Sequence, residues 1–552
     1  MKTMCFLGFL SVLTLYTQAQ ADIDDNYTKA ISFEKQLIEN YDRMLKSTVL
    51  ITKGTGVIVS EDGYILTAAH VVEGLIEEFG DSIYTDIQLY DGRELKAKIL
   101  GRDEINDYAL LKIVDEGTWQ YSKIGNTDTF GENNICFMLG HPGGREENRP
   151  AVLRMGFYEL LADNYFFQTT CIMNPGDSGG PLFDIKGEVV GLCSFNNIKT
   201  EFNFYTNIGY VKRNWHKLLA GEVFNILSSL DYESSSGHGL YTPRIKNEVN
   251  AIDGGSKGFK EVFNKLKNET AHSIVLVRSN KNKQKSLVSG SIIHSDGYIV
   301  AKSSIVGNEN IECYLPDKEW VEAKVIHRFI ENDLALIKVE KNNLKPLNMS
   351  FQDQLKPGDF VATIDYKDSI RYAGVVGVQT RKIPEKSPPY GFLGLKFKDG
   401  LEVEQVVGYS PAYNVGVKKG DRLLKMGQDS IADLQSFYKW MEATKPNQII
   451  SFSLERDGEE LNFDATLIKN TFWRPRFKNG KNGHNWADGL SAVFTHDMPL
   501  VYDDAGTPVI NLDGDVVGIN IAKENRTCSF AIPIYEVKKL LDTYLQKHET
   551  DK

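Results

Sequence analysis

The stretch Asn174-Pro175-Gly176-Asp177-Ser178-Gly179-Gly180-Pro181 predicts a loop that presents a nucleophilic serine. A serine hydroxyl needs a base to take its proton and nearby donors to stabilise the oxyanion that forms when it attacks a carbonyl. Gly176 can adopt backbone angles closed to other residues, so its N–H and that of Ser178 could form an oxyanion hole. The same residues are also typical of a glycine-rich turn between two strands. A catalytic role for Ser178 therefore depends on whether a base and an acid stand elsewhere in the chain.

Two such partners precede Ser178. His70 ends the phrase Thr67-Ala68-Ala69-His70 after a strand-like run, and Asp107 stands directly before the apolar run 108–113. The order His70, Asp107, Ser178, set among many short strands, resembles the trypsin-like double β-barrel, and the phrasing most resembles the HtrA/Deg branch of that family. The resemblance covers about residues 45–220.

The resemblance implies a role for each residue. His70 would be general base and then acid, Asp107 would orient it, Ser178 would attack the carbonyl, and the N–H groups of Gly176 and Ser178 would form the oxyanion hole. Asp177 departs from the asparagine common in HtrA sequences. It matches digestive trypsins, in which an aspartate here pairs with a freed amino terminus, although nothing in this sequence indicates such processing.

The resemblance also places the primary specificity pocket, with its base near Ile172 and its wall on the strand that contains Ser194 and Phe195. No acidic side chain stands at the base. We therefore expect a small or aliphatic residue before the scissile bond, rather than Lys or Arg.

The composition limits the class of protein. A chain of 552 residues exceeds one hydrophobic core and predicts several domains. A formal net charge of −11 argues against nucleic acid or an anionic membrane surface as the main partner. The cysteines after residue 21 have no metal-ligand spacing, so we expect no metal and no cofactor. Cys171 and Cys193 could form a disulfide, but buried free thiols are the preferred interpretation.

The amino-terminal region predicts export. Residues 1–21 contain a largely apolar run and end in Gln18-Ala19-Gln20-Ala21, which suits cleavage of a signal peptide after Ala21. About eleven apolar residues are too few to span the hydrocarbon core, so we expect no membrane span after cleavage and a periplasmic or extracellular location. Residues 22–45 form a predicted helical segment, with apolar side chains at helix-like spacing at Ile31, Phe33, Leu37, Ile38, Tyr41 and Leu45.

After the protease domain (46–225) and a predicted linker (226–258), the same phrases recur in order. The copy of the histidine phrase has Ser304 in place of the histidine, the copy of the acid phrase keeps Asp333, and the copy of the nucleophile phrase has Ala505 in place of the serine. We interpret this unit as a degenerate protease fold, or pseudoprotease, formed by 259–387 and 469–546 and followed by a tail at 547–552.

The second unit contains an insertion. Asp333 and Ala505 are 172 positions apart, whereas Asp107 and Ser178 are 71 apart. Residues 388–468 resemble an HtrA-type PDZ domain, which binds the C-terminus of a peptide as an added strand. The resemblance implies that the loop Phe392-Leu393-Gly394-Leu395 holds the peptide carboxylate. A purely structural PDZ domain is the alternative, and its place inside the second unit departs from HtrA proteins.

The sequence therefore predicts a mostly β protein with an active trypsin-like double β-barrel, a second degenerate double β-barrel and an inserted PDZ domain. The resemblance implies an ATP-independent serine endopeptidase that acts on unfolded or damaged envelope proteins, and a possible homo-oligomer. A chaperone or peptide-binding scaffold with an unused triad is the alternative.

Overall fold

The computed structural model describes residues 2–52, 54–73, 84–161, 165–196, 202–224, 251–281, 284–384, 390–398, 400–407, 410–446, 448–469 and 489–549. Strands dominate, and they form closed barrels and a separate PDZ domain, so the predicted fold class is confirmed. Most of the predicted linker, residues 226–250, lies outside the described residues.

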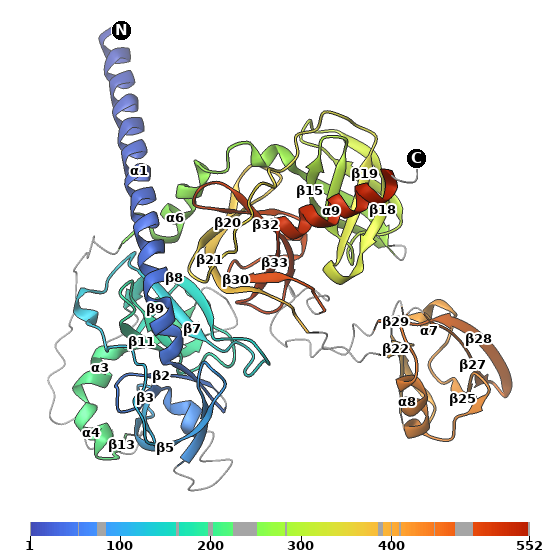
Figure 1. Ribbon diagram of the computed structural model, residues 1–552, viewed down its shortest axis with the longest axis horizontal. Coiled ribbons are helices and arrows are strands. Elements are labelled where there is room, and N and C mark those ends of the chain that lie inside the picture. Colours follow the sequence, from blue (N-terminus) through green and yellow to red (C-terminus); the bar gives the residue numbers. More distant parts are fainter. Residues whose placement is uncertain are drawn as a thin grey trace.

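The first unit contains two six-stranded barrels (Figure 1). In the first, the order β5-β4-β1-β2-β3-β6 is closed by pairing of β5 with β6, and β13 adds to β5 in parallel. The second is closed in the order β10-β11-β12-β9-β8-β7. The strands are β1 (Thr48–Ile51), β2 (Gly54–Ile58), β3 (Tyr64–Thr67), β4 (Tyr84–Gln88), β5 (Glu94–Asp103), β6 (Tyr108–Ile113), β7 (Ile135–Gly140), β8 (Val152–Leu161), β9 (Phe166–Thr169), β10 (Pro181–Phe183), β11 (Val189–Asn196), β12 (Asn203–Asn207) and β13 (Val223–Phe224).

The second unit repeats this architecture. Its barrels close in the orders β14-β15-β16-β19-β18-β17 and β20-β21-β30-β33-β32-β31, which match the first unit strand for strand. The strands are β14 (Ile274–Lys281), β15 (Gln284–His294), β16 (Tyr298–Lys302), β17 (Glu309–Tyr314), β18 (Trp320–Phe329), β19 (Leu334–Val339), β20 (Phe360–Ile364), β21 (Ile370–Arg381), β30 (Val493–His496), β31 (Pro508–Asn511), β32 (Val516–Lys523) and β33 (Ser529–Pro533). The PDZ domain enters between β21 and β30, where the first unit connects β8 to β9.

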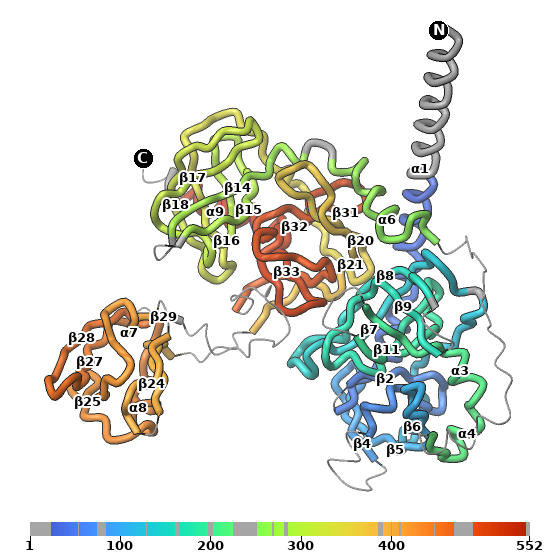
Figure 2. The backbone as a smooth tube through the Cα atoms, turned by 180° about the vertical axis from the view of Figure 1, so that it is seen from behind, coloured from blue at the N-terminus to red at the C-terminus, as the bar shows by residue number. Residues whose placement is uncertain are grey.

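The PDZ domain has a hydrophobic core of its own and lies apart from the barrels in both views (Figures 1 and 2). Its ends pair with each other, because β22 is antiparallel to β29. The elements are β22 (Gly391–Phe392), β23 (Leu395–Phe397), β24 (Val403–Val406), α7 (Pro411–Asn414), β25 (Arg422–Met426), β26 (Asp429–Ser430), α8 (Leu434–Glu442), β27 (Ile449–Arg456), β28 (Glu459–Thr466) and β29 (Ile468–Lys469).

The remaining helices are α1 (Lys2–Ser47), α3 (Ile208–Arg213), α4 (Trp215–Leu219), α6 (Gly255–Asn264) and α9 (Ile534–Glu549). The part of the predicted linker that the structure describes is ordered, because Asn26 of α1 both donates to and accepts from the backbone of Asp253. α9 continues through Glu549, so the predicted tail at 547–552 begins within a helix. None of the helices in the described ranges is long and apolar enough to cross a membrane.

The two units share one core, and α1 joins them. Phe33 and Leu37 of α1 belong to a buried cluster that also contains Phe137 of the first unit and Phe360 of the second. The rings of Phe137 and Phe360 stack with their centroids 6.5 Å apart. The carboxylate of Glu34 accepts the backbone N–H of Phe360 at 2.7 Å. Figure 2 shows α1 running from the first unit toward α6.

We predict that Phe33→Ala lowers the free energy of unfolding by about 3–5 kcal/mol, because the side chain is 3% exposed and its removal leaves a cavity between the units. Ile31→Ala is the matched control on the same helix. Ile31 is 44% exposed, and its truncation should change stability by no more than about 0.5 kcal/mol. Urea unfolding measures both variants, and equal losses would contradict the assigned helix face.

Candidate functional site

The nucleophile loop lies between β9 and β10 and packs against β2. The backbone N–H of Thr55 donates to the carbonyl of Ser178 at 2.8 Å, and the Thr55 hydroxyl donates to the carbonyl of Gly176 at 2.8 Å. Gly176 has φ +96, and a Cβ there would overlap the carbonyl of His141. Within the described chain, the N–H groups of Gly176 and Ser178 donate to no other group, which leaves both available to an oxyanion.

His70 and Asp107 meet beside this loop. His70 follows β3 and Asp107 precedes β6, and these two strands pair, with Thr67 opposite Ala109. The Nδ1 of His70 lies 2.9 Å from each carboxylate oxygen of Asp107, and the backbone N–H of His70 donates to Oδ1 at 3.0 Å. Asp107 adopts the left-handed conformation, with φ 56, which turns its carboxylate toward the histidine.

The electrostatics of the pair favour charge on both partners. Desolvation opposes the imidazolium of His70, but its hydrogen bond with Asp107 and the attraction to that carboxylate outweigh burial, so the pKa of His70 is raised. Desolvation likewise opposes the carboxylate of Asp107, and hydrogen bonds from His70 and Ser194 hold the pKa of Asp107 below its usual value. Asp107 can therefore stabilise a proton taken up by His70.

Gly54 joins the two halves of the site. A Cβ at Gly54 would lie 2.7 Å from the carbonyl oxygen of Ser178 and 2.7 Å from a methyl of Val71, the residue after His70. Only a residue without a side chain lets the nucleophile loop and the histidine segment approach this closely. The structure therefore gathers all three predicted triad positions at the junction of the two barrels.

The residues predicted for the specificity pocket have different surroundings. The hydroxyl of Ser194 on β11 donates to Oδ2 of Asp107, a contact that the sequence analysis did not anticipate. Phe195 is 49% exposed and packs with Phe166 and Phe204 at centroid distances of 5.2 and 4.8 Å. Ile172 is half-buried beside the nucleophile loop. Ser194 thus supports the carboxylate of Asp107, and the assignment of Ile172, Ser194 and Phe195 to the specificity pocket stays a prediction.

Asp177 has a partner that the sequence did not reveal. Its buried carboxylate forms a bidentate ion pair with the equally buried Arg154 of β8, with N–O distances of 2.5 and 2.9 Å. The pairing with a freed amino terminus seen in digestive trypsins is therefore replaced by an internal guanidinium.

The cysteines behind the loop are free thiols. Cys171 and Cys193 are buried and unbridged, in agreement with the preferred interpretation and not with a disulfide. Burial raises the pKa of Cys171 to about 12, so its thiol is protonated at neutral pH.

The second unit preserves the hydrogen bonds of the site without its reactive groups. Asp333 has φ 52, like Asp107, and accepts the backbone N–H of Ser304 at 2.7 Å, as Asp107 accepts that of His70. The carboxylate of Asp333 also accepts the Ser304 hydroxyl at 2.7 Å and the ammonium of the buried Lys302 at 2.5 Å. Ala505 occupies the nucleophile position and is fully buried in the adjoining core.

The predicted carboxylate loop of the PDZ domain connects β22 to β23. Gly394 has φ +95, and a Cβ there would overlap the side chain of Ser410. The N–H groups of Leu393 and Gly394 donate to no other group of the described chain. Among the pairings of the described strands, β23 pairs with β24 on one edge only, which leaves the other edge open to a peptide strand.

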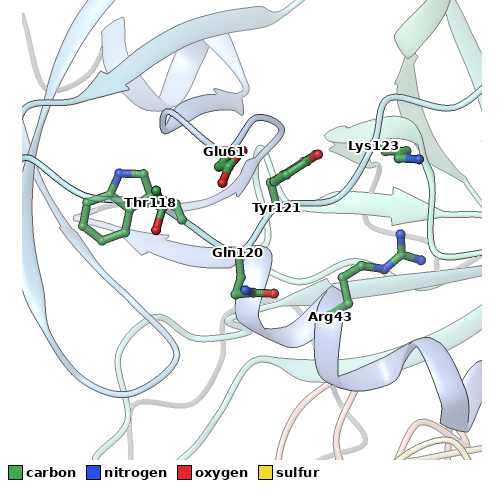
Figure 3. Close-up of a pocket in the computed structure, with 7 residues that line it drawn as sticks. Arg43, Glu61, Thr118, Gln120, Tyr121 and Lys123 are labelled. Atoms are coloured by element: carbon green, nitrogen blue, oxygen red, sulfur yellow. The ribbon is translucent and has the colours of Figure 1, made fainter.

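A separate pocket of about 300 Å³ lies between α1 and the segment that joins the first two barrels (Figure 3). Its lining contains none of the candidate site residues; it is formed by Arg43, Glu61, Thr118, Trp119, Gln120, Tyr121 and Lys123. Within the described ranges, no three His, Cys, Asp or Glu side chains are grouped so that they could hold a metal ion.

Comparisons with known proteins agree with this geometry. Residues 54–192 match the trypsin-like peptidase domain family, and residues 374–467 match the PDZ domain family. A protein of Marinomonas sp. (strain MWYL1), named probable periplasmic serine endoprotease DegP-like, is 28% identical over 414 residues, which are 73% of this chain and 77% of that protein. A protein of the same name from Halomonas elongata is 40% identical over 26% of this chain and 29% of its own length.

This chain is a serine endopeptidase with a trypsin-like peptidase domain and a PDZ domain, and it is similar to the DegP-like endoproteases. The solved structure of the serine endoprotease from Yersinia pestis aligns with 80% of this chain and 97% of its own chain, at 15% identity and a TM-score of 0.29. In this chain the PDZ domain lies inside the second double barrel, between β21 and β30.

We predict that the imidazole of His70 titrates with a pKa above about 6.5, its ordinary value. Asp107→Asn should lower this pKa below the ordinary value, because the attraction is lost while desolvation remains. By linkage, the attraction between the imidazolium of His70 and the carboxylate of Asp107 stabilises the fold at pH values below the ordinary pKa of histidine. This contribution to stability is lost as the pH rises through the raised pKa of His70. NMR titration of the imidazole protons measures both values, and an unchanged pKa in Asp107→Asn would contradict the assignment.

Proposed function

We propose that His70, Asp107 and Ser178 form the catalytic triad of this endopeptidase. The observation that carries the proposal is the meeting of His70 and Asp107 at 2.9 Å beside a loop in which the N–H groups of Gly176 and Ser178 are unused. Ser178 attacks the scissile carbonyl while His70 takes its proton, and His70 then returns that proton to the leaving amine. The two N–H groups stabilise the oxyanion. Ser194 supports the carboxylate that holds His70.

The substrates we propose are unfolded or damaged proteins of the cell envelope, cleaved without ATP. Support comes from the periplasmic serine endoproteases to which the chain is similar. A signal peptide at 1–21, removed after Ala21, would deliver the chain to that compartment. The predicted specificity pocket of Ile172, Ser194 and Phe195 has no acidic side chain at its base, so it would favour a small or aliphatic residue before the scissile bond. Assembly into a homo-oligomer stays a prediction from the resemblance.

For the second unit we propose a role without chemistry. The second unit lacks a general base, because Ser304 occupies the position that His70 has in the first unit. It also lacks a nucleophile, because Ala505 occupies the position of Ser178. The ammonium of Lys302 also compensates the charge of Asp333. In the first unit, the corresponding carboxylate of Asp107 faces His70 instead. These features support a pseudoprotease that serves the first unit by contact.

Substitutions at Ser178 and His70 test the proposed triad. Ser178→Ala and His70→Ala should each reduce casein cleavage to background, and the double variant should lose no more, because attack and proton transfer act as one unit. Ala505→Ser is the matched control, since it restores a serine in the second loop without a base, and it should leave the rate unchanged. Ser178→Ala should also lose labelling by a fluorophosphonate. Retained cleavage in purified Ser178→Ala would refute the triad. A wild type that neither cleaves casein nor reacts with the fluorophosphonate would favour a chaperone or scaffold.

We also propose that the PDZ domain binds hydrophobic C-terminal peptides at the Phe392-Leu393-Gly394-Leu395 loop. The open edge of β23 and the unused N–H groups of Leu393 and Gly394 support this role. Bound peptide would change proteolysis at Ser178 by favouring one arrangement of the units.

We expect Gly394→Val to abolish binding of a fluorescent C-terminal peptide, because its side chain would overlap Ser410, while cleavage of a small fluorogenic peptide stays intact. Gly400→Ala is the matched control: Gly400 has a similar φ of +87, and a Cβ there meets no neighbour. Adding C-terminal peptide to the wild type should change the rate on the small substrate about 5- to 150-fold. If the peptide binds without changing this rate, the proposed coupling to Ser178 is wrong, and the PDZ domain serves only to tether substrates.

A further inference from the structure

The nucleophile loop, residues 174–181, contains a buried aspartate, Asp177. Asp177 lies between Gly176 and Ser178, the two residues whose N–H groups face the oxyanion. Its carboxylate is fully buried, and Oδ2 also accepts the backbone N–H of Asn174 at 2.7 Å. The Asp177 side chain therefore ties the loop back to Asn174, and its own position is set by Arg154.

Arg154 in turn lies against the second unit. The next residue on β8, Met155, donates its backbone N–H to Oδ2 of Asp497 at 2.8 Å. The other oxygen of Asp497 accepts the N–H of Val375 on β21 at 2.8 Å. One buried carboxylate of the second unit thus ties β8 to β21. The contact is tight, because a Cβ at Gly374 would overlap Asp497 and a Cβ at Gly377 would overlap the carbonyl of Leu153.

Charge links the same groups. Burial raises the pKa of Asp497 to about 6, and the nearby guanidinium of Arg154 opposes that rise. The guanidinium of Arg154 therefore forms its ion pair with Asp177 of its own unit and lies close enough to Asp497 of the other unit to act on its charge. The backbone N–H of the next residue, Met155, makes the direct contact with Asp497.

We propose that Arg154 and Asp497 are positioning residues for proteolysis at Ser178. Arg154 holds Asp177 and, through it, the nucleophile loop. The loop therefore needs no freed amino group to pair with Asp177. Asp497 holds β8, the strand that carries Arg154. The inference rests on the proposed oxyanion role of Gly176 and Ser178. The catalytically inert unit is, on this view, a permanent part of the active enzyme.

The second unit supplies a matched control. Its own loop aspartate, Asp504, is paired with Arg371 of β21 at 2.7 Å and accepts the N–H of Val501 at 2.7 Å, as Asp177 accepts that of Asn174. Arg371→Met therefore removes the corresponding ion pair from a loop that has no nucleophile.

The test measures kcat and KM on a fluorogenic peptide with Val before the scissile bond, together with the rate of fluorophosphonate labelling. Arg154→Met should lower kcat and labelling about 100-fold or more, with KM within about threefold, because the oxyanion donors are displaced and the substrate strand is not. Asp497→Asn keeps the shape but replaces one acceptor with an N–H₂ group, and it should lower kcat about tenfold. Arg371→Met should stay within about twofold of the wild type.

Rescue separates positioning from a general loss of structure. Asp177→Asn added to Arg154→Met should restore at least about tenfold in kcat, because asparagine leaves no buried charge to compensate. Near-UV circular dichroism checks folding, and if Arg154→Met does not fold, the double variant and Asp497→Asn decide the question. Arg154→Met or Asp497→Asn with kcat within about threefold of the wild type would overturn the proposal, as would an equal loss in Arg371→Met. Activity retained in Ser178→Ala would instead refute the triad itself.

Discussion

The buried ion pair between Arg154 and Asp177 is the interaction on which the geometry of the site depends. Two charges are removed from water here, which is costly unless the geometry is good and the remaining hydrogen-bonding positions are filled. The bidentate contact and the N–H of Asn174 meet that condition for the carboxylate of Asp177. Within the described residues, the Nε of Arg154 has no hydrogen-bond partner. Because Asp177 lies within the nucleophile loop, the electrostatic requirement of one side chain becomes a constraint on the backbone of its neighbours.

The second unit shows that this loop geometry does not depend on catalysis. The loop around Ala505 keeps the turn, the aspartate and its arginine, and Asp333 keeps the left-handed conformation of Asp107. What changes is the group beside the carboxylate: Ser304 replaces the histidine, and the ammonium of Lys302 lies 2.5 Å from Asp333. The barrels are therefore stable without the reactive groups, and the hydrogen-bond frame is a property of the fold.

The sequence predicted well those parts of the molecule that depend on neighbouring residues. His70, Asp107 and Ser178 each stand in a local phrase, and the resemblance of these phrases to the trypsin-like family implied the barrels. The sequence did not predict contacts between distant segments. Arg154 is an ordinary strand residue until β8 places it against Asp177, and Met155 and Asp497 are 342 positions apart. Exposure on α1 could not be read from periodicity alone, since Ile31 is exposed while Phe33 and Leu37 are buried.

The pairing of β22 with β29 has a consequence for how the chain folds. The barrel that contains β21 and β30 can close only when two strands more than a hundred residues apart come together, and each doubling of an unfolded loop costs about 0.6 kcal/mol in closure entropy. The inserted domain has its own core and joins its two ends as adjacent strands. Once it has folded, the insertion acts as a much shorter loop, so the kinetics of barrel closure should follow the order in which the two domains fold.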